Sequence, residues 1–186
     1  MGRLLSFLLL KLFGWKYIGE APEDKRFVVI SVPHTSGWDF VWGKLAFGLH
    51  GINPIVFIKK ESFFFPVGTL LRWLGARPVD RGRGAVGLVD LVLQYFEKSE
   101  EFVVCLTPEG TREKVTKWKR GFYFMAQKAN VPIYLGYIDY KKKELSIGEK
   151  FLPTGIIEDD FAYFVTYYKR IRPTAKYPDK FSYDFS

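Results

Sequence analysis

The sequence predicts an α/β fold in which one mixed β-sheet is flanked by helices. Short apolar runs rich in valine, isoleucine and phenylalanine alternate with longer segments that have the length and pattern of helices. The chain has 186 residues, which is enough for one hydrophobic core, and no linker rich in proline, glycine or serine divides it. We therefore expect one domain over residues 17–186, preceded by an N-terminal helix within residues 1–16.

Each element follows from its local pattern. Strands are predicted where an apolar run of four to seven residues is bounded by glycine, proline or charged residues, and helices where the apolar segment is longer. The first helix ends near Phe13, and a short strand follows it at residues 15–19. The remaining predicted elements are strand 27–32, helix 38–49, strand 54–59, helix 67–74, strand 76–79, helix 86–98, strand 102–106, helix 122–128, strand 131–137, strand 144–148 and helix 159–170.

The N-terminal helix is apolar and carries basic residues at Arg3, Lys11 and Lys16. It is too short to span a bilayer, which takes about 20 apolar residues. No small-residue cleavage site follows it, so a signal peptide is not expected. We expect the helix to lie in the headgroup region of an anionic membrane, on the cytoplasmic face of the inner membrane. The alternative is a helix packed on the domain.

Composition narrows the classes of partner. Lysine and arginine total 28 against 20 aspartate and glutamate residues, and the net charge of +8 suits anionic partners such as lipid headgroups. The basic residues are dispersed and no nucleic-acid-binding motif is present, so we expect no nucleic acid partner. With two histidines and one cysteine, Cys105, the chain offers neither an internal disulfide nor a zinc-type ligand cluster.

A histidine and an aspartate, His34 and Asp39, follow the predicted strand at residues 27–32. Ligands of open α/β sheets bind at the carboxyl ends of strands, which is where this pair is expected. An imidazole is the side chain best suited to accept a proton from a hydroxyl at neutral pH, and a carboxylate can fix its tautomer. The pair is therefore a candidate general base, and an ordinary helix start is the alternative.

A second polar block follows the predicted strand at residues 102–106. Glu109, Gly110, Thr111 and Arg112 follow one another here, and the glycine permits a tight turn whose amides and arginine can hold an anion. A plain turn, with Glu109 in a structural role, is the alternative. Between the two blocks, Arg81 could present its guanidinium to a phosphate or belong to a solvated basic loop.

Taken together, these blocks resemble the glycerolipid acyltransferase family, which includes the lysophosphatidate acyltransferases. The resemblance runs from about Phe27 to about Tyr140, and its four blocks occur in the family's order: residues 34–39, 75–81, 109–112 and 131–133. Two departures are Pro33, where the family often has asparagine, and the dipeptide Gly37 and Trp38 before the aspartate. They leave the catalytic groups in place but affect the shape of the acceptor pocket.

The resemblance implies a fold like that of glycerol-3-phosphate acyltransferase, and acyl transfer without a cofactor. The acyl donor would be acyl-CoA or an acyl-carrier-protein thioester, and the acceptor a hydroxyl of a glycerophosphate or lysophospholipid. It implies that His34 is the base, that Asp39 orients it and that Arg81 binds the acceptor phosphate. Residues 109–112 would then serve acceptor binding and site architecture. The alternatives are an acceptor such as another lysolipid or an amine-containing lipid, or a catalytically silent membrane-binding protein.

Overall fold

The centre of the structure is a strand whose side chains are buried on both faces. In the computed structural model, which describes residues 2–79 and 84–184, this strand is β2 (Arg26–Val32). Its residues 27–30 are at most 1% exposed. It pairs in parallel with β5 (Phe102–Leu106) on one side and β6 (Ile133–Asp139) on the other. Parallel strands covered on both faces have continuous apolar runs, which is the pattern that predicted this strand.

Over the described residues, seven strands form one mixed sheet in the order β1-β7-β6-β2-β5-β3-β4. Among the strand pairs of the described residues, β6 with β7 is antiparallel and the others are parallel. The other strands are β1 (Lys16–Tyr17), β3 (Ile55–Lys59), β4 (Ala76–Val79) and β7 (Glu144–Phe151). The α/β fold and the mixed sheet predicted from the sequence are thereby confirmed.

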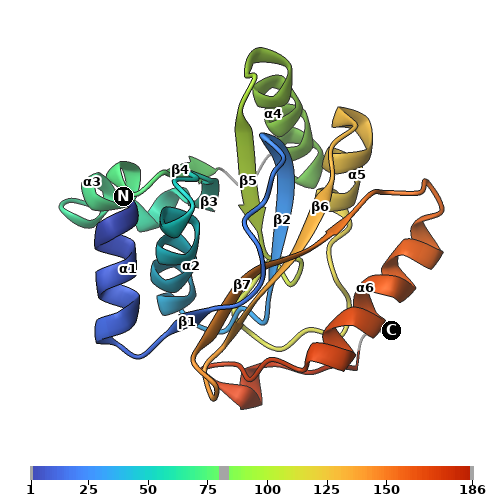
Figure 1. The fold of residues 1–186 in the computed structure, drawn as a ribbon. Coiled ribbons are helices and arrows are strands. Elements are labelled where there is room, and N and C mark those ends of the chain that lie inside the picture. The colour runs from blue at the N-terminus through green and yellow to red at the C-terminus, as the bar shows by residue number, and fades with distance from the viewer. Residues whose placement is uncertain (1, 80–83, 185–186) are drawn as a thin grey trace.

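Helices cover both faces of the sheet (Figure 1). One face carries the largest apolar cluster, to which α4, α5 and α6 contribute, and α2 packs on the other face with α1 against it. The helices are α1 (Arg3–Leu12), α2 (Trp38–Leu49), α3 (Val67–Trp73), α4 (Gly84–Lys98), α5 (Gly121–Ala129) and α6 (Ile157–Ile171). Two 3₁₀ turns that the sequence did not predict are η1 (Lys60–Ser62) and η3 (Pro178–Lys180).

The N-terminal helix packs on the domain by one side and exposes apolar residues on the other. Leu10 is 3% exposed and belongs to a cluster with residues of α2 and β7, whereas Leu4 and Leu12 are 70% and 75% exposed. Within the described part of the chain, no helix has the length and apolar content that crossing a membrane requires.

The carboxyl ends of the central strands meet at one edge of the sheet. In the parallel pairs, Ile30 lies opposite Leu106 and Val32 lies opposite Tyr137. The segments that follow β2, β5 and β6 therefore leave the sheet at the same edge. This register brings together three segments that are far apart in the sequence and places the candidate site.

Candidate active site

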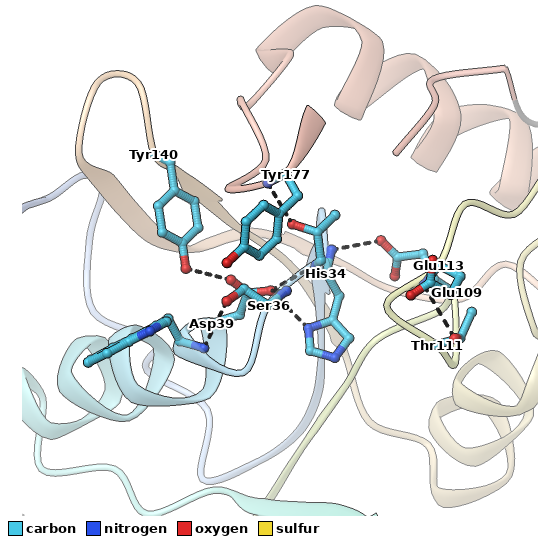
Figure 2. Close-up of polar contacts among 10 residues, drawn as sticks. His34, Ser36, Asp39, Glu109, Thr111, Glu113, Tyr140 and Tyr177 are labelled. Atoms are coloured by element: carbon cyan, nitrogen blue, oxygen red, sulfur yellow. Dashed lines mark hydrogen bonds and ion pairs between the residues drawn. The ribbon is translucent and has the colours of Figure 1, made fainter. Parts of the chain in front are cut away.

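His34 and Asp39 form a hydrogen-bonded pair at the carboxyl end of β2. The Nδ1 atom of His34 lies 3.0 Å from Oδ2 of Asp39 (Figure 2). Asp39 lies in the first turn of α2, which begins one residue earlier and folds the carboxylate back toward the imidazole. The two residues that the sequence singled out are thus in direct contact.

The Asp39 carboxylate is held in place by further donors and is buried. The backbone N–H groups of Thr35 and Ser36 each donate to Oδ2 at 2.9 Å, and the Tyr140 hydroxyl donates to Oδ1 at 2.6 Å. Burial, followed by this bond to a carboxylate, raises the pKa of the Tyr140 phenol, which therefore stays protonated and keeps donating. The carboxylate cannot rotate away from His34 without losing these bonds.

This geometry selects the tautomer of His34. A carboxylate accepts hydrogen bonds, so Nδ1 carries the proton and Nε2 keeps its lone pair. The His34 side chain is 24% exposed and lines a cavity, so the imidazole is accessible from that side. The backbone N–H of His34 donates to Oε1 of Glu109 at 3.1 Å, which fixes the start of this loop.

Glu109 is a buried acid that supports the loop. It is 3% exposed, and its Oε2 atom has no hydrogen-bond partner among the described residues. Burial raises the pKa of its carboxyl to about 8, and the nearby charge of Asp39 acts in the same direction. The side chain is therefore mainly neutral at pH 7. Its position favours the structural alternative over a role as base.

The remaining residues of the second block shape the loop after β5. Gly110 has φ +65°, a backbone conformation that favours glycine, and a Cβ there would lie 2.8 Å from Cε of the flexible Lys119 side chain, which would have to shift. The Thr111 hydroxyl accepts the backbone N–H of Glu113 at 3.3 Å. Arg112 extends toward the first loop, where a Cβ on Gly37 would lie 3.5 Å from Nη1 of Arg112.

Arg81, the predicted phosphate ligand, lies outside the described residues. The structure therefore brings His34, Asp39, Glu109 and the Arg112 loop to one place and leaves the position of Arg81 a prediction. Tyr140 is the contact that sequence reasoning missed. It lies 101 residues from Asp39, and no local spacing signals the pairing.

Two cavities adjoin the His34 loop and share part of their lining. The larger, about 650 Å³, is lined by His34 and Asp39 and extends among apolar residues under α2, including Phe47, Ile138 and Ile147. The smaller, about 370 Å³, is polar and is lined by Arg112 and by Lys180 and Glu113, which form an ion pair at 2.6 Å. Gly37 and Arg112 line both cavities. The arrangement suits a molecule that has an apolar chain and a polar, anionic head.

Two other titratable side chains, Cys105 and Lys44, line the larger cavity. Burial raises the pKa of the Cys105 thiol to about 12 and keeps it uncharged. Lys44 is 4% exposed, and desolvation lowers the pKa of its ammonium group. Within residues 2–79 and 84–184, no cluster of three or more metal-ligating side chains occurs.

Comparisons with known proteins are consistent with this geometry. The profile of the family described as Acyltransferase matches residues 16–136. Among solved structures, the chain is similar to the 1-acyl-sn-glycerophosphate (LPA) acyltransferase PlsC from Thermotoga maritima, with a TM-score of 0.64. The two are 20% identical, and the match covers 90% of this chain and 75% of the other, so it shows a shared fold. A comparison with curated protein sequences found no match.

Proposed function

This chain belongs to the acyltransferase family, and we propose that it transfers a fatty acyl group to a hydroxyl of a glycerophosphate or lysophospholipid in phospholipid biosynthesis. The observation that carries the proposal is the His34 and Asp39 pair, which lines the largely apolar cavity, while residues 35–37 between them line the polar one. The donor in this proposal is a thioester of coenzyme A or acyl-carrier protein, and no cofactor takes part.

In the proposed mechanism, Nε2 of His34 removes the proton from the acceptor hydroxyl while the hydroxyl oxygen attacks the thioester carbonyl carbon. Asp39 stabilises the imidazolium that forms. When the tetrahedral intermediate collapses, the carbon–sulfur bond breaks and the leaving thiolate takes the proton from His34. An ester and a free thiol result, and the pair returns to its starting state. A thioester is already activated, so no protein nucleophile is required.

The two cavities divide the substrates by polarity. A hydrocarbon chain is stabilised in the larger cavity by contact with apolar side chains. The phosphate of the acceptor fits the polar cavity, where the Arg112 guanidinium can form paired charge-assisted hydrogen bonds with it. Arg81 is proposed as a further ligand of the acceptor phosphate, and Glu109, Gly110 and Thr111 are proposed to shape the acceptor side.

We further propose that the protein is peripheral on the cytoplasmic face of the inner membrane, where its lipid acceptor resides. Support comes from the exposed leucines of α1 at Leu4, Leu8 and Leu12 and from the net charge of +8. Together they combine apolar burial with attraction to anionic lipid.

The test is an acceptor screen with purified protein. Acyl-CoA and acyl-carrier-protein thioesters are each offered with glycerol 3-phosphate, lysophosphatidate, lysophosphatidylethanolamine and an amine-containing lysolipid, and products are identified by mass spectrometry. We expect acylation of a phosphate-bearing acceptor. Arg112→Ala is expected to raise KM for that acceptor more than KM for the donor. Acylation of amines alone would show that the acceptor is an amine and not the hydroxyl of a glycerophosphate or lysophospholipid. No acylation of any acceptor would contradict the proposal.

A further inference from the structure

Apolar side chains are concentrated on a short segment between β3 and β4 that the core does not cover. We call this surface the α3 patch; it comprises five residues of the loop and helix. Their exposed fractions are 62% for Phe64, 88% for Phe65, 38% for Val67, 56% for Leu70 and 74% for Trp73. Apolar exposure this dense on a water-soluble surface marks an interaction site.

Local contacts hold these side chains outward. Phe63 is half-buried, and the Arg72 guanidinium lies 5.3 Å from the centroid of its ring. Gly68 packs so closely on the Phe63 backbone that a Cβ there would lie 2.5 Å from the Phe63 carbonyl oxygen. These contacts hold Phe63 against the turn, while the side chains of Phe64 and Phe65 are exposed to solvent. Val67, Leu70 and Trp73 recur every three residues and so share one side of α3.

The same segment borders the substrate cavity. Lys59, Ser62 and Leu71 line the larger cavity; the first two precede the α3 patch in the sequence, and Leu71 lies between Leu70 and Trp73. A surface that binds the α3 patch therefore lies beside part of the cavity wall. Figure 1 shows α3 and the N-terminal end of α1 at the same flank of the molecule, away from α5 and α6.

The charges around the patch select its partner. Residues 59–77 contain Lys59, Lys60, Arg72 and Arg77, all exposed, against one acidic residue, Glu61. Exposed aromatic rings next to basic side chains suit the boundary between acyl chains and anionic headgroups. We propose that the α3 patch is a membrane-contact surface that brings this side of the cavity to an anionic bilayer. The inference rests on the proposed function, since a lipid substrate would enter from that bilayer.

The test measures binding to vesicles by flotation, which needs no catalysis. One set of vesicles contains phosphatidylcholine alone and the other adds phosphatidylglycerol. The variant Phe64→Ser/Phe65→Ser/Trp73→Ser is compared with the matched control Leu152→Ser/Ile156→Ser, which removes residues of 64% and 59% exposure elsewhere. We expect at least roughly tenfold weaker vesicle binding for the patch variant and none of this loss for the control. Lys60→Glu/Arg77→Glu is expected to lose only the preference for anionic vesicles.

Melting temperature, soluble activity and oligomeric state are measured as well, to show that any loss of flotation comes from the membrane contact. Melting temperature and acylation of soluble, short-chain substrates should match the wild type in the patch variant, because none of its changed residues lines the cavity. Unchanged flotation would overturn the inference. Loss of the soluble activity in the patch variant would instead show that the patch binds substrate. A wild type that is a dimer and a patch variant that is a monomer would show that the patch binds a second copy of the chain. An inactive wild type that still floats through the patch would contradict the proposed function alone.

Discussion

At the residue scale, the Asp39 carboxylate is the fixed point of the candidate site. Among the described residues it accepts hydrogen bonds from His34, Thr35, Ser36 and Tyr140, so both of its oxygens are engaged. An aspartate held in this way cannot swing toward solvent when the imidazole becomes charged. The loop supplies two of these bonds from its own backbone, and Tyr140, the residue after β6, supplies the fourth.

Tyr140→Phe tests whether that fourth bond matters for the chemistry. We expect kcat to fall about tenfold with KM unchanged, because a hydrogen bond to a charged group is lost while the cavity lining is retained. The check is steady-state kinetics of acyl transfer. Tyr163→Phe is the matched control, since the Tyr163 hydroxyl also donates to a carboxylate, that of Glu149, but Tyr163 is not among the residues lining the two cavities. Equal effects of the two variants, or a change in KM alone, would refute the positioning role.

Glu109→Gln tests the buried acid. The carboxyl holds its proton up to a pH of about 8 in the folded chain, because burial raises its pKa from the ordinary 4.5. Between these values the folded state binds more protons than the unfolded state, so wild-type stability falls as pH rises. Glutamine does not titrate. The stability of the variant relative to wild type should therefore increase from pH 4.5 to 8, by at most about 5 kcal/mol.

Urea unfolding at pH 5 and pH 8.5 measures this difference. Glu113→Gln serves as the control, because that carboxylate is exposed and forms an ion pair with Lys180 at 2.6 Å. A stability difference between Glu109→Gln and wild type that does not change with pH would show that Glu109 ionises normally.

At the element scale, the loop after β5 depends on one backbone conformation. Gly110→Ala places a Cβ against Lys119 at a residue with φ +65°. We expect a loss of about 1–2 kcal/mol in the free energy of unfolding and a rise in KM for the acceptor, because Arg112 is carried by this loop. Gly121→Ala is the control, since its nearest neighbour, a Val89 methyl group, lies 3.9 Å away. A Gly110→Ala variant with wild-type stability would contradict this assignment.

Substitutions on the exposed and on the buried side of α1 are expected to have different effects, one on membrane binding and the other on stability. Leu4→Ser/Leu8→Ser changes exposed residues and should weaken binding to anionic vesicles while leaving the melting temperature unchanged. Leu10→Ala removes a buried side chain and should cost about 2–5 kcal/mol of stability. Flotation and thermal melts of the same samples separate the effects. A large fall in melting temperature for the first variant would show that α1 serves only to complete the core.

At the scale of the whole molecule, the sequence predicted what is local. Apolar runs located β2 and β5 to within a residue. β6 begins two residues later than expected because the Val131 N–H donates to the Ala126 carbonyl at the end of α5 instead of to a neighbouring strand. The contact between His34 and Asp39 was predictable because the two residues are close in the sequence: His34 follows the end of β2, and Asp39 lies in the first turn of the next helix.

Features that depend on the tertiary fold could not be predicted. Tyr140 reaches Asp39 only because β6 pairs in parallel with β2, which no spacing in the sequence encodes. The exposure of the α3 patch could not be predicted, since hydropathy does not reveal which side of a short helix lacks a neighbour. The raised pKa of Glu109 arises from burial by segments far from it in the sequence.

His34, oriented by Asp39, is proposed to act as the general base of the acyl transfer. The most direct measurement is kcat/KM of purified wild type and of His34→Ala for the acceptor identified in the screen, with thermal melts confirming that both are folded. We predict a fall of about 10²- to 10⁴-fold, the usual effect of losing a general base. A folded His34→Ala variant with turnover close to the wild-type value would contradict the account.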